Sequence, residues 1–272
     1  MVQSKHETQV NVVRIREHRV KVESRADPLR LHAQTRSISR GRKKPVVVFS
    51  HGFSVDGLES HRLFHKTSRV LNEAGYSCLM YDNFGIGYSD GDYRDFRLSL
   101  AARDLVDMAE FALKRTRNNG KVVVLGQSLG TAAAALAEVA LRRVCAGIVL
   151  WNLSADIKGR YPALFGDGIA TDPNHCLEVK GHVIGSDFFE DAIRLDVLGS
   201  FDDWCTPVLF LNAQADEVST SEYAQVASER VDPSLQTTVR IVGANHSFKC
   251  QPDLESDAVG HTLAWVENVA CT

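Results

Sequence analysis

The stretch with the clearest chemical potential is the G-x-S-x-G pentapeptide over residues 126–130, which reads Gly-Gln-Ser-Leu-Gly. It directly follows an apolar run at 122–125 and directly precedes an alanine-rich run at 129–141. A strand, a sharp turn and a helix in this order present the serine hydroxyl above a sheet. Flanking glycines leave room where a Cβ would clash, and the helix N-terminus directs N–H groups at the reacting oxygen. We therefore predict that Ser128 is a nucleophile, the alternative being a turn without chemistry.

A serine nucleophile needs a base and an acid, because its hydroxyl is weakly reactive until a base removes the proton. After a pentapeptide of this kind, the acid comes next along the chain and the histidine last. His246 lies in a loop directly after an expected strand at 238–242, and Asp216 follows an expected strand at 208–211. We predict that His246 is the base and that Asp216 orients it and stabilises its protonated form. Glu217 is the alternative acid.

Acyl transfer also requires two N–H donors for the negative oxygen that develops in the transition state. One donor belongs to the residue after the nucleophile, which predicts Leu129. The other comes from the loop that follows the expected strand 46–49, which predicts Phe53. We expect His51, in the same loop, to shape that loop by hydrogen bonding rather than to take part in the chemistry.

Apolar strands and amphipathic helices alternate along most of the chain. This alternation predicts one α/β domain over 1–272, with a mostly parallel sheet and helices on both faces. Two short alternating runs, at 10–15 and 20–22, predict a preceding hairpin. The alternation of strands and helices stops after Trp151, and we expect a cap inserted at about 155–204. The expected strands are 46–49, 77–81, 122–125, 148–151, 208–211 and 238–242, and the expected helices are 60–74, 98–112, 129–141, 220–230 and 254–268.

The charge is uneven although the formal net charge of the 272 residues is only −3. The first 44 residues hold 12 lysines and arginines against four acidic residues, and the remainder is net acidic. Basic residues commonly protect an exposed edge strand from aggregation, and this is our interpretation. A patch for an acidic partner, such as a carrier protein, is the alternative.

The cysteine spacing and the apolar runs indicate whether the protein binds a metal and in which cellular compartment it is expected. No two of the six cysteines have C-x-x-C spacing, so we expect no metal site. Cys78 and Cys145 fall in or beside apolar runs and are expected to be buried. The sequence has no signal-peptide core and no run of about 18 apolar residues. We expect a cytoplasmic protein with free thiols and no membrane span.

Together these residues resemble the α/β-hydrolase superfamily. The matching pieces are His51-Gly52-Phe53, the D-x-x-G-x-G-x-S-x-G stretch over 82–91, the pentapeptide at 126–130, Asp216 and His246. The G-x-x-F-x-x-D segment over 185–191 is similar to the cap of small intracellular esterases that include cinnamoyl and feruloyl esterases. The resemblance implies an eight-stranded, mostly parallel sheet, a short cap over the site, an acyl-enzyme mechanism and no cofactor.

Three functions are consistent with these residues. Hydrolysis of a small-molecule carboxylic ester is the first. Thioester hydrolysis or acyl transfer, with the acyl group on coenzyme A or an acyl carrier protein, uses the same triad. A non-catalytic small-molecule receptor is the third, because a fold does not determine a function. We expect no nucleic-acid partner.

Four aromatic residues are candidates for lining a pocket, although packing is the simpler interpretation: Trp151, Tyr161, Phe188 and Phe189.

Overall fold

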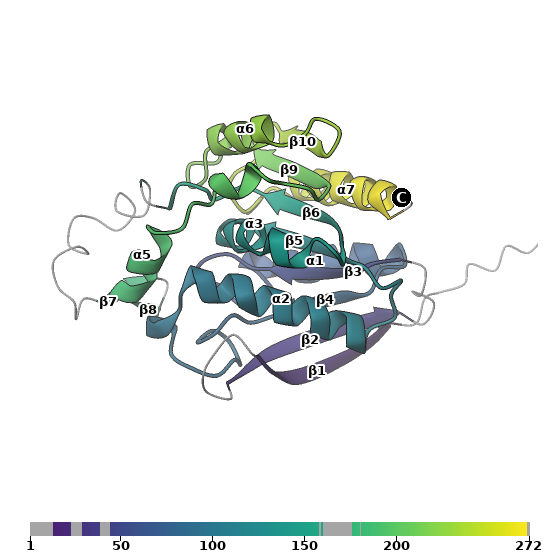
Figure 1. Ribbon diagram of the computed structural model, residues 1–272. Coiled ribbons are helices and arrows are strands. Elements are labelled where there is room, and N and C mark those ends of the chain that lie inside the picture. Colours follow the sequence, from purple (N-terminus) through teal and green to yellow (C-terminus); the bar gives the residue numbers. More distant parts are fainter. Residues whose placement is uncertain are drawn as a thin grey trace, which may run out of the picture.

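An eight-stranded sheet forms the centre of the computed structural model, which describes residues 13–22, 29–38, 44–157, 159, 176–179 and 181–270. The strand order is β1-β2-β4-β3-β5-β6-β9-β10 (Figure 1). β2 pairs antiparallel with β1 and β4, and the other neighbours are parallel. This confirms the expected sheet. The strands are β1 (Val13–Lys21), β2 (Arg30–Ile38), β3 (Val46–Ser50), β4 (Cys78–Tyr81), β5 (Val122–Gln127), β6 (Cys145–Trp151), β9 (Val208–Ala213) and β10 (Gln236–Ile241).

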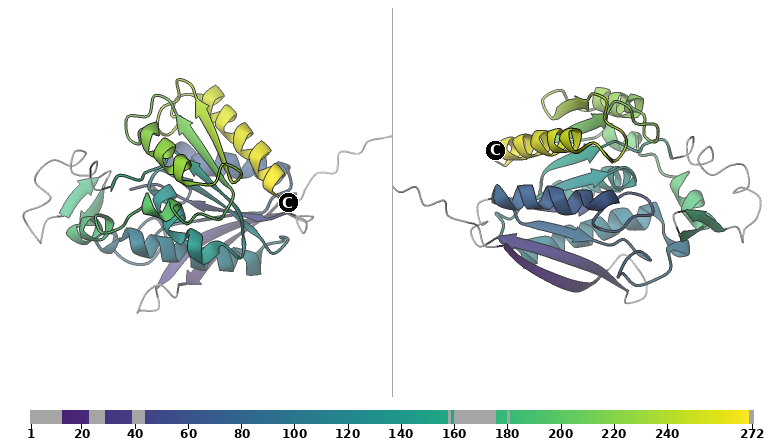
Figure 2. Two further views of the ribbon diagram at one scale, coloured as in Figure 1. Left: turned by 45° about the horizontal axis from the view of Figure 1, so that its top comes forward. Right: turned by 180° about the vertical axis from the view of Figure 1, so that it is seen from behind.

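Helices cover both faces of the sheet because each carries an apolar stripe that must be buried. The stripes of α2, α3 and α6 join the core on one face, and those of α1 and α7 join the core on the other. Figure 2 shows α1 and α7 in front of the sheet when the molecule is seen from behind. The helices are α1 (Leu63–Glu73), α2 (Leu98–Arg115), α3 (Leu129–Leu141), α6 (Ser221–Arg230) and α7 (Pro252–Val269), with short 3₁₀ turns at Ser60–Arg62, Tyr93–Asp95 and Gly199–Phe201.

The hairpin at the start of the described chain differs from the expected one. β1 is a single strand over Val13–Lys21, and its partner β2 covers Arg30–Ile38, in a stretch that the sequence did not mark as a strand. β2 was missed because polar residues interrupt its apolar ones, although Leu31, Ala33 and Ile38 are all buried. Residues 10–12 of the expected hairpin lie outside the described part of the chain.

Further elements, here called the insert, lie between β6 and β9, within the range where we expect a cap. The described part of the insert contains the antiparallel pair β7 (Cys176–Val179) and β8 (His182–Gly185), followed by α5 (Ser186–Ala192). Asp191 of α5 accepts hydrogen bonds from the backbone N–H and the hydroxyl of Ser99, at 2.9 and 2.5 Å. The insert is therefore attached to the N-terminus of α2 (Figure 1). Tyr161 lies outside the described residues.

The turn from β5 into α3 is strained and closely packed. Ser128 has φ 52° and ψ −122°, values that residues other than glycine rarely adopt. A Cβ on Gly126 would lie 2.6 Å from the carbonyl oxygen of Gly130, and a Cβ on Gly130 would lie 1.9 Å from that of Ser50. The glycines therefore allow α3 to begin directly against the end of β3, as the pentapeptide predicts.

We expect Gly130→Ala to lower the free energy of unfolding by about 3 kcal/mol or more, because the new methyl group overlaps the backbone of β3. Gly260→Ala is the matched control. Gly260 lies in α7, where a Cβ meets nothing within 4 Å, and alanine should raise the stability by up to about 1 kcal/mol. Urea unfolding followed by circular dichroism measures both. A Gly130→Ala protein as stable as the wild type contradicts the packing argument.

Candidate active site

A histidine and a carboxylate meet at the carboxyl edge of the sheet. His246 Nδ1 lies 2.7 Å from Asp216 Oδ2, and the Asp216 side chain is only 1% exposed. The other carboxylate oxygen accepts the N–H groups of Val218 and Ser219, at 2.7 and 2.8 Å. Asp216 is thus held by its own turn with one oxygen directed at the imidazole, whereas Glu217, the alternative acid, is exposed.

Two side-chain amides hold the backbone of His246 in place. Its carbonyl oxygen accepts from Gln127 Nε2 at 2.8 Å and from Asn152 Nδ2 at 2.6 Å. Gln127 precedes Ser128, so its hydrogen bond brings His246 beside the nucleophile turn. Asn152 follows β6 with φ 56°, and its Oδ1 accepts the N–H of Ala213 at 2.7 Å. Sequence reasoning missed both amides, and the only available signal was that each stands at the end of an apolar strand.

The loop after β3 passes next to Ser128. The N–H of Gly52 donates to Glu59 Oε2 at 2.7 Å, and a Cβ on Gly52 would lie 3.4 Å from the Ser128 Cβ. Phe53 follows Gly52, and Leu129 is the first residue of α3. The two expected oxyanion donors therefore belong to adjacent backbone segments. Their role remains a prediction, as does proton transfer, since the described residues form no hydrogen bond between Ser128 and His246. Such bonds are often long without substrate.

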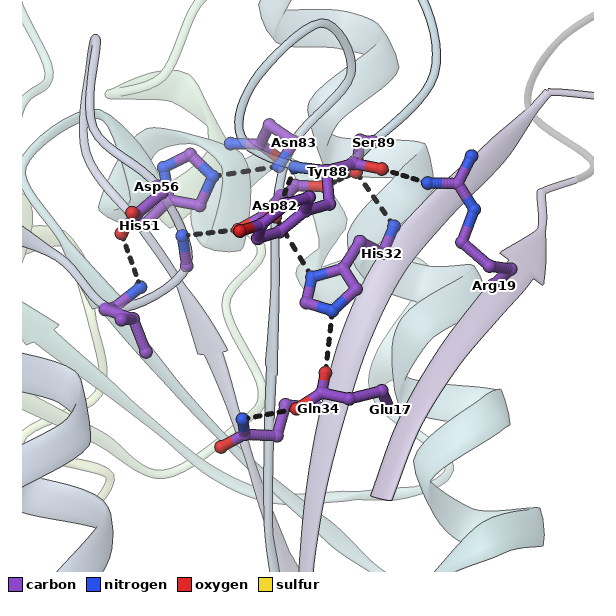
Figure 3. A network of polar contacts seen from close by, with 12 residues as sticks. Glu17, Arg19, His32, Gln34, His51, Asp56, Asp82, Asn83, Tyr88 and Ser89 are labelled. Carbon is purple, nitrogen blue, oxygen red and sulfur yellow. Dashed lines mark hydrogen bonds and ion pairs between the residues drawn. The ribbon is translucent and has the colours of Figure 1, made fainter. Parts of the chain in front are cut away.

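His51 has the loop-shaping contacts that we expected. Its Nε2 accepts the N–H of Asn83 at 2.9 Å (Figure 3), so its proton must be on Nδ1. Nδ1 lies 2.9 Å from the carbonyl oxygen of Gly52 and donates to it. Both ring nitrogens are occupied by backbone groups of the loop and the following turn. His51 is therefore a positioning residue and not a second base.

A buried carboxylate organises the turn over 82–91. Asp82 accepts the N–H groups of Gly57 and Tyr88, both at 2.9 Å, and its Oδ2 lies 3.0 Å from His32 Nδ1 (Figure 3). His32 Nε2 in turn lies 2.6 Å from Glu17. This network joins β1 and β2 to the loop that carries Phe53, and it agrees with our expectation of a structured turn.

A cavity of about 550 Å³ opens beside this network, but it does not contain the triad. None of Ser128, Asp216 and His246 lines it. We place the candidate active site at Ser128 rather than in this cavity, because nucleophilic chemistry requires the nucleophile and its base together. The cavity is lined by Glu17, Arg19, His32, Gln34, Asp56, Gly57, Leu58, Met80, Tyr81, Asp82, Gly87 and Tyr88.

Aromatic side chains from three segments meet at the candidate oxyanion loop. The ring of Phe53 lies 5.0 Å from that of Phe188 in α5 and 6.0 Å from that of Tyr93, between centroids. Phe189 packs edge-on against Phe188 at 5.2 Å. Trp151 instead packs against Phe248 on the opposite face of the sheet, so its role is packing. The insert thus contributes an aromatic wall beside Phe53.

The buried thiols are poor nucleophiles. Cys78 and Cys145 are buried, as expected, and burial raises the pKa of both thiols, that of Cys145 to about 12. Cys205 and Cys250 are free and exposed. Within the described residues, no group of three or more histidine, cysteine or acidic side chains is placed to hold a metal ion. In the same part of the chain, no helix is both long and apolar enough to cross a membrane.

Comparisons with known proteins agree with the fold described above. Residues 41–170 match the family described as serine aminopeptidase, S33. Est1E from Butyrivibrio proteoclasticus, solved with ferulic acid bound, superposes with a TM-score of 0.75 at 21% identity, over 90% of this chain and 98% of Est1E. The α/β-hydrolase GrgF from Penicillium sp. sh18 superposes with a TM-score of 0.76 at 17% identity, over 95% and 100% of the two chains.

A thermophilic esterase from Thermogutta terrifontis, solved with malate bound, gives a TM-score of 0.66 at 20% identity, over 94% of this chain and 99% of the esterase. No curated protein sequence matches the chain. Superpositions at such low sequence identity show the fold alone. They show that the chain has the α/β-hydrolase fold, as the resemblance in its motifs implies.

The contact between Asp216 and His246 predicts which ring nitrogen carries the proton. In the neutral ring we expect the proton on Nδ1, because this nitrogen faces a carboxylate oxygen. In Asp216→Asn, the amide oxygen stays with the N–H groups of Val218 and Ser219 and the NH₂ group faces Nδ1, so the proton should move to Nε2. Nitrogen-15 NMR of His246 distinguishes the tautomers. Glu217→Gln is the control, and an unchanged tautomer in Asp216→Asn argues against the contact.

Proposed function

We propose that this α/β-hydrolase is a serine hydrolase that cleaves carboxylic esters through an acyl-enzyme intermediate. Ser128 is the nucleophile, His246 the base and Asp216 the acid that orients the base. The observation that carries the proposal is the contact between buried Asp216 and His246, at the sheet edge where Ser128 stands in a strained turn. The esterases among the structures of similar fold support the same reaction class.

In the proposed reaction, Ser128 Oγ attacks the ester carbonyl carbon while His246 Nε2 takes the hydroxyl proton, since Nδ1 faces Asp216. The developing oxyanion accepts the N–H groups of Phe53 and Leu129. His246 then protonates the leaving alkoxide, and the C–O bond breaks. In the second half, His246 removes a proton from water, and the water oxygen attacks the acyl carbon. His246 then returns the proton to Ser128 Oγ as the acyl C–O bond breaks, which releases the acid and free Ser128.

The aromatic wall favours an acyl group with a flat ring. Phe188 is buried in this cluster, whereas Phe53 and Phe189 are half-buried, so these two rings have faces or edges left to contact an acyl group. Aromatic rings prefer offset or tilted contacts with one another. The ferulic acid bound in Est1E is a ligand with an aromatic ring. We therefore extend the proposal to esters of aromatic acids as preferred substrates.

Thioester hydrolysis or acyl transfer with a carrier protein is less well supported. Among the described residues, Arg14 and Arg16 of β1 share a hollow with Arg115 and Arg117. The carbonyl of Arg117 accepts from Ser77, which precedes β4, so this charge lies at the amino edge of the sheet. Ser128 lies at the carboxyl edge. These cations are therefore not placed to bring an acidic carrier to the nucleophile.

Ser128→Ala should lower kcat/KM for p-nitrophenyl esters by about 10⁴-fold or more, since the nucleophile is lost. A series from the acetate to the laurate ester measures this and also sizes the acyl pocket. Ser256→Ala, an exposed serine of α7, is the matched control and should retain full activity. Equal activity of Ser128→Ala and wild type refutes the assignment.

If the wild type cleaves no oxygen ester, a thioester panel at several salt concentrations decides between the remaining functions. Turnover of carrier-bound thioesters that weakens with ionic strength supports steering by exposed charge and the thioesterase function. Saturable ligand binding without any turnover supports a receptor.

Phe53→Ala should lower kcat/KM for methyl cinnamate up to about tenfold more than for methyl butyrate, because it removes the ring and keeps the backbone donor. Phe111→Ala is the control, since Phe111 lies on α2 against His18, at the edge strand and away from the insert. Equal losses on both esters in Phe53→Ala contradict the aromatic preference. Steady-state kinetics with both esters provides the test.

A further inference from the structure

Five basic residues line a hollow of about 220 Å³, here called the cationic groove. β1 and β2 pair so that Arg16 stands opposite Thr35 and Arg14 opposite Ser37. Partners across an antiparallel pair share one face of the sheet, so these arginines lie beside the hydroxyls. The groove is lined by Arg14, Arg16, Thr35, Ser37, Ile38, Lys114, Arg115, Thr116 and Arg117.

The groove shares a face of the sheet with the end of α2. His18, on the same side of β1 as Arg14 and Arg16, places its ring 5.0 Å from that of Phe111 in α2. Beyond the end of this helix, the N–H of Arg117 donates to Ser37 Oγ at 3.3 Å. The cations therefore come from two segments that are far apart in the sequence.

The charged residues that line the groove are all basic. Lys114 pairs with Glu110 at 3.3 Å, and no acidic residue lines the groove. Within the described part of the chain, Arg14, Arg16 and Arg115 form no ion pair. The pKa of His18 is lowered, first by burial and then by the charges of Arg115 and Arg16. The positive charges of β1 and of the end of α2 thus act together beside His18.

The basic residues of β1 and those at the end of α2 each have a general explanation. Basic residues protect edge strands, and basic residues near the C-terminus of a helix interact favourably with its dipole. Neither explanation requires the two groups to meet in one hollow with three hydroxyl-bearing residues. Like charges that converge repel each other, and a bound anion removes that cost.

We propose that the cationic groove binds a ligand that carries a phosphate or diphosphate group. Guanidinium groups match phosphate oxygens with paired N–H donors. Of the lining hydroxyls, that of Thr116 donates to the carbonyl of Ala112 and that of Thr35 is paired with His18, so Ser37, whose oxygen accepts the N–H of Arg117, supplies the hydroxyl donor. A phosphate offers three acceptor oxygens and about two negative charges, which suits several cations better than one carboxylate does.

The groove is separate from the candidate active site. The N–H of Asn119 donates to the carbonyl of Lys44 at 3.1 Å, just before β3, so the loop after α2 lies at the amino edge of the sheet. Ser128 stands at the other end of β5, whose six residues span about 20 Å. The phosphate site is therefore independent of the proposed ester hydrolysis.

Inorganic pyrophosphate is the probe, and isothermal titration calorimetry of the full chain at low salt is the measurement. We expect saturable binding by the wild type. We also expect at least about tenfold weaker binding by Arg16→Gln and by Arg115→Gln, because each loses a charge-assisted contact. Arg240→Gln, an exposed arginine on β10 at the far edge of the sheet, is the matched control and should bind as the wild type does.

Two further readouts separate a phosphate site from general charge. Pyrophosphate should raise the Tm of the wild type but not that of Arg16→Gln, since a ligand stabilises only a fold that binds it. Citrate, an anion that carries only carboxylates, should bind at least about tenfold more weakly than pyrophosphate. Equal affinity for citrate, equal affinity in Arg16→Gln and Arg240→Gln, or no saturable binding at millimolar concentration each overturns the proposal.

Discussion

The contact between Gly130 and the carbonyl oxygen of Ser50 is the constraint on which the candidate active site depends. It lets α3 begin against the end of β3, with no side chain between them. The same approach holds Ser128 in its strained conformation and places the loop of Gly52 beside it. A larger residue at position 130 would separate the nucleophile from the loop that carries the expected oxyanion donor Phe53.

Hydrogen bonds between buried side chains and backbone groups hold the loops around this contact. Glu59 accepts from Gly52, Asp82 accepts from Gly57, and the carbonyl of His246 accepts from Gln127 and Asn152. Burying such groups without partners costs free energy, so each loop conformation stabilises the next one. The site is therefore positioned by hydrogen bonds between strand ends more than by its own apolar contacts.

The two edges of the sheet differ in chemistry. The carboxyl edge carries Ser128, His246 and buried acids, whereas Arg14 and Arg16 of β1 gather with the basic residues at and just beyond the end of α2, toward the amino edge. A small overall net charge conceals this separation, because the basic first segment and the acidic remainder largely cancel. Opposite edges of one sheet can thus serve two independent ligands.

The sequence by itself determined most of the sheet, the helices and the turn at Ser128. These features rest on local rules: apolar runs form buried strands, helical stripes form helices, and glycines allow a strained turn. It also indicated His246 and Asp216, because chain order after the pentapeptide restricts where each can stand.

Only the tertiary structure decided the position of β2, the two amides on His246 and the cationic groove. β2 has a weak local pattern and becomes a strand by pairing with both β1 and β4. Asn152 and Arg115 acquire their roles from residues that are distant in the sequence. Spacing along the chain carries no signal for such contacts, since they arise from the way the strands and helices pack.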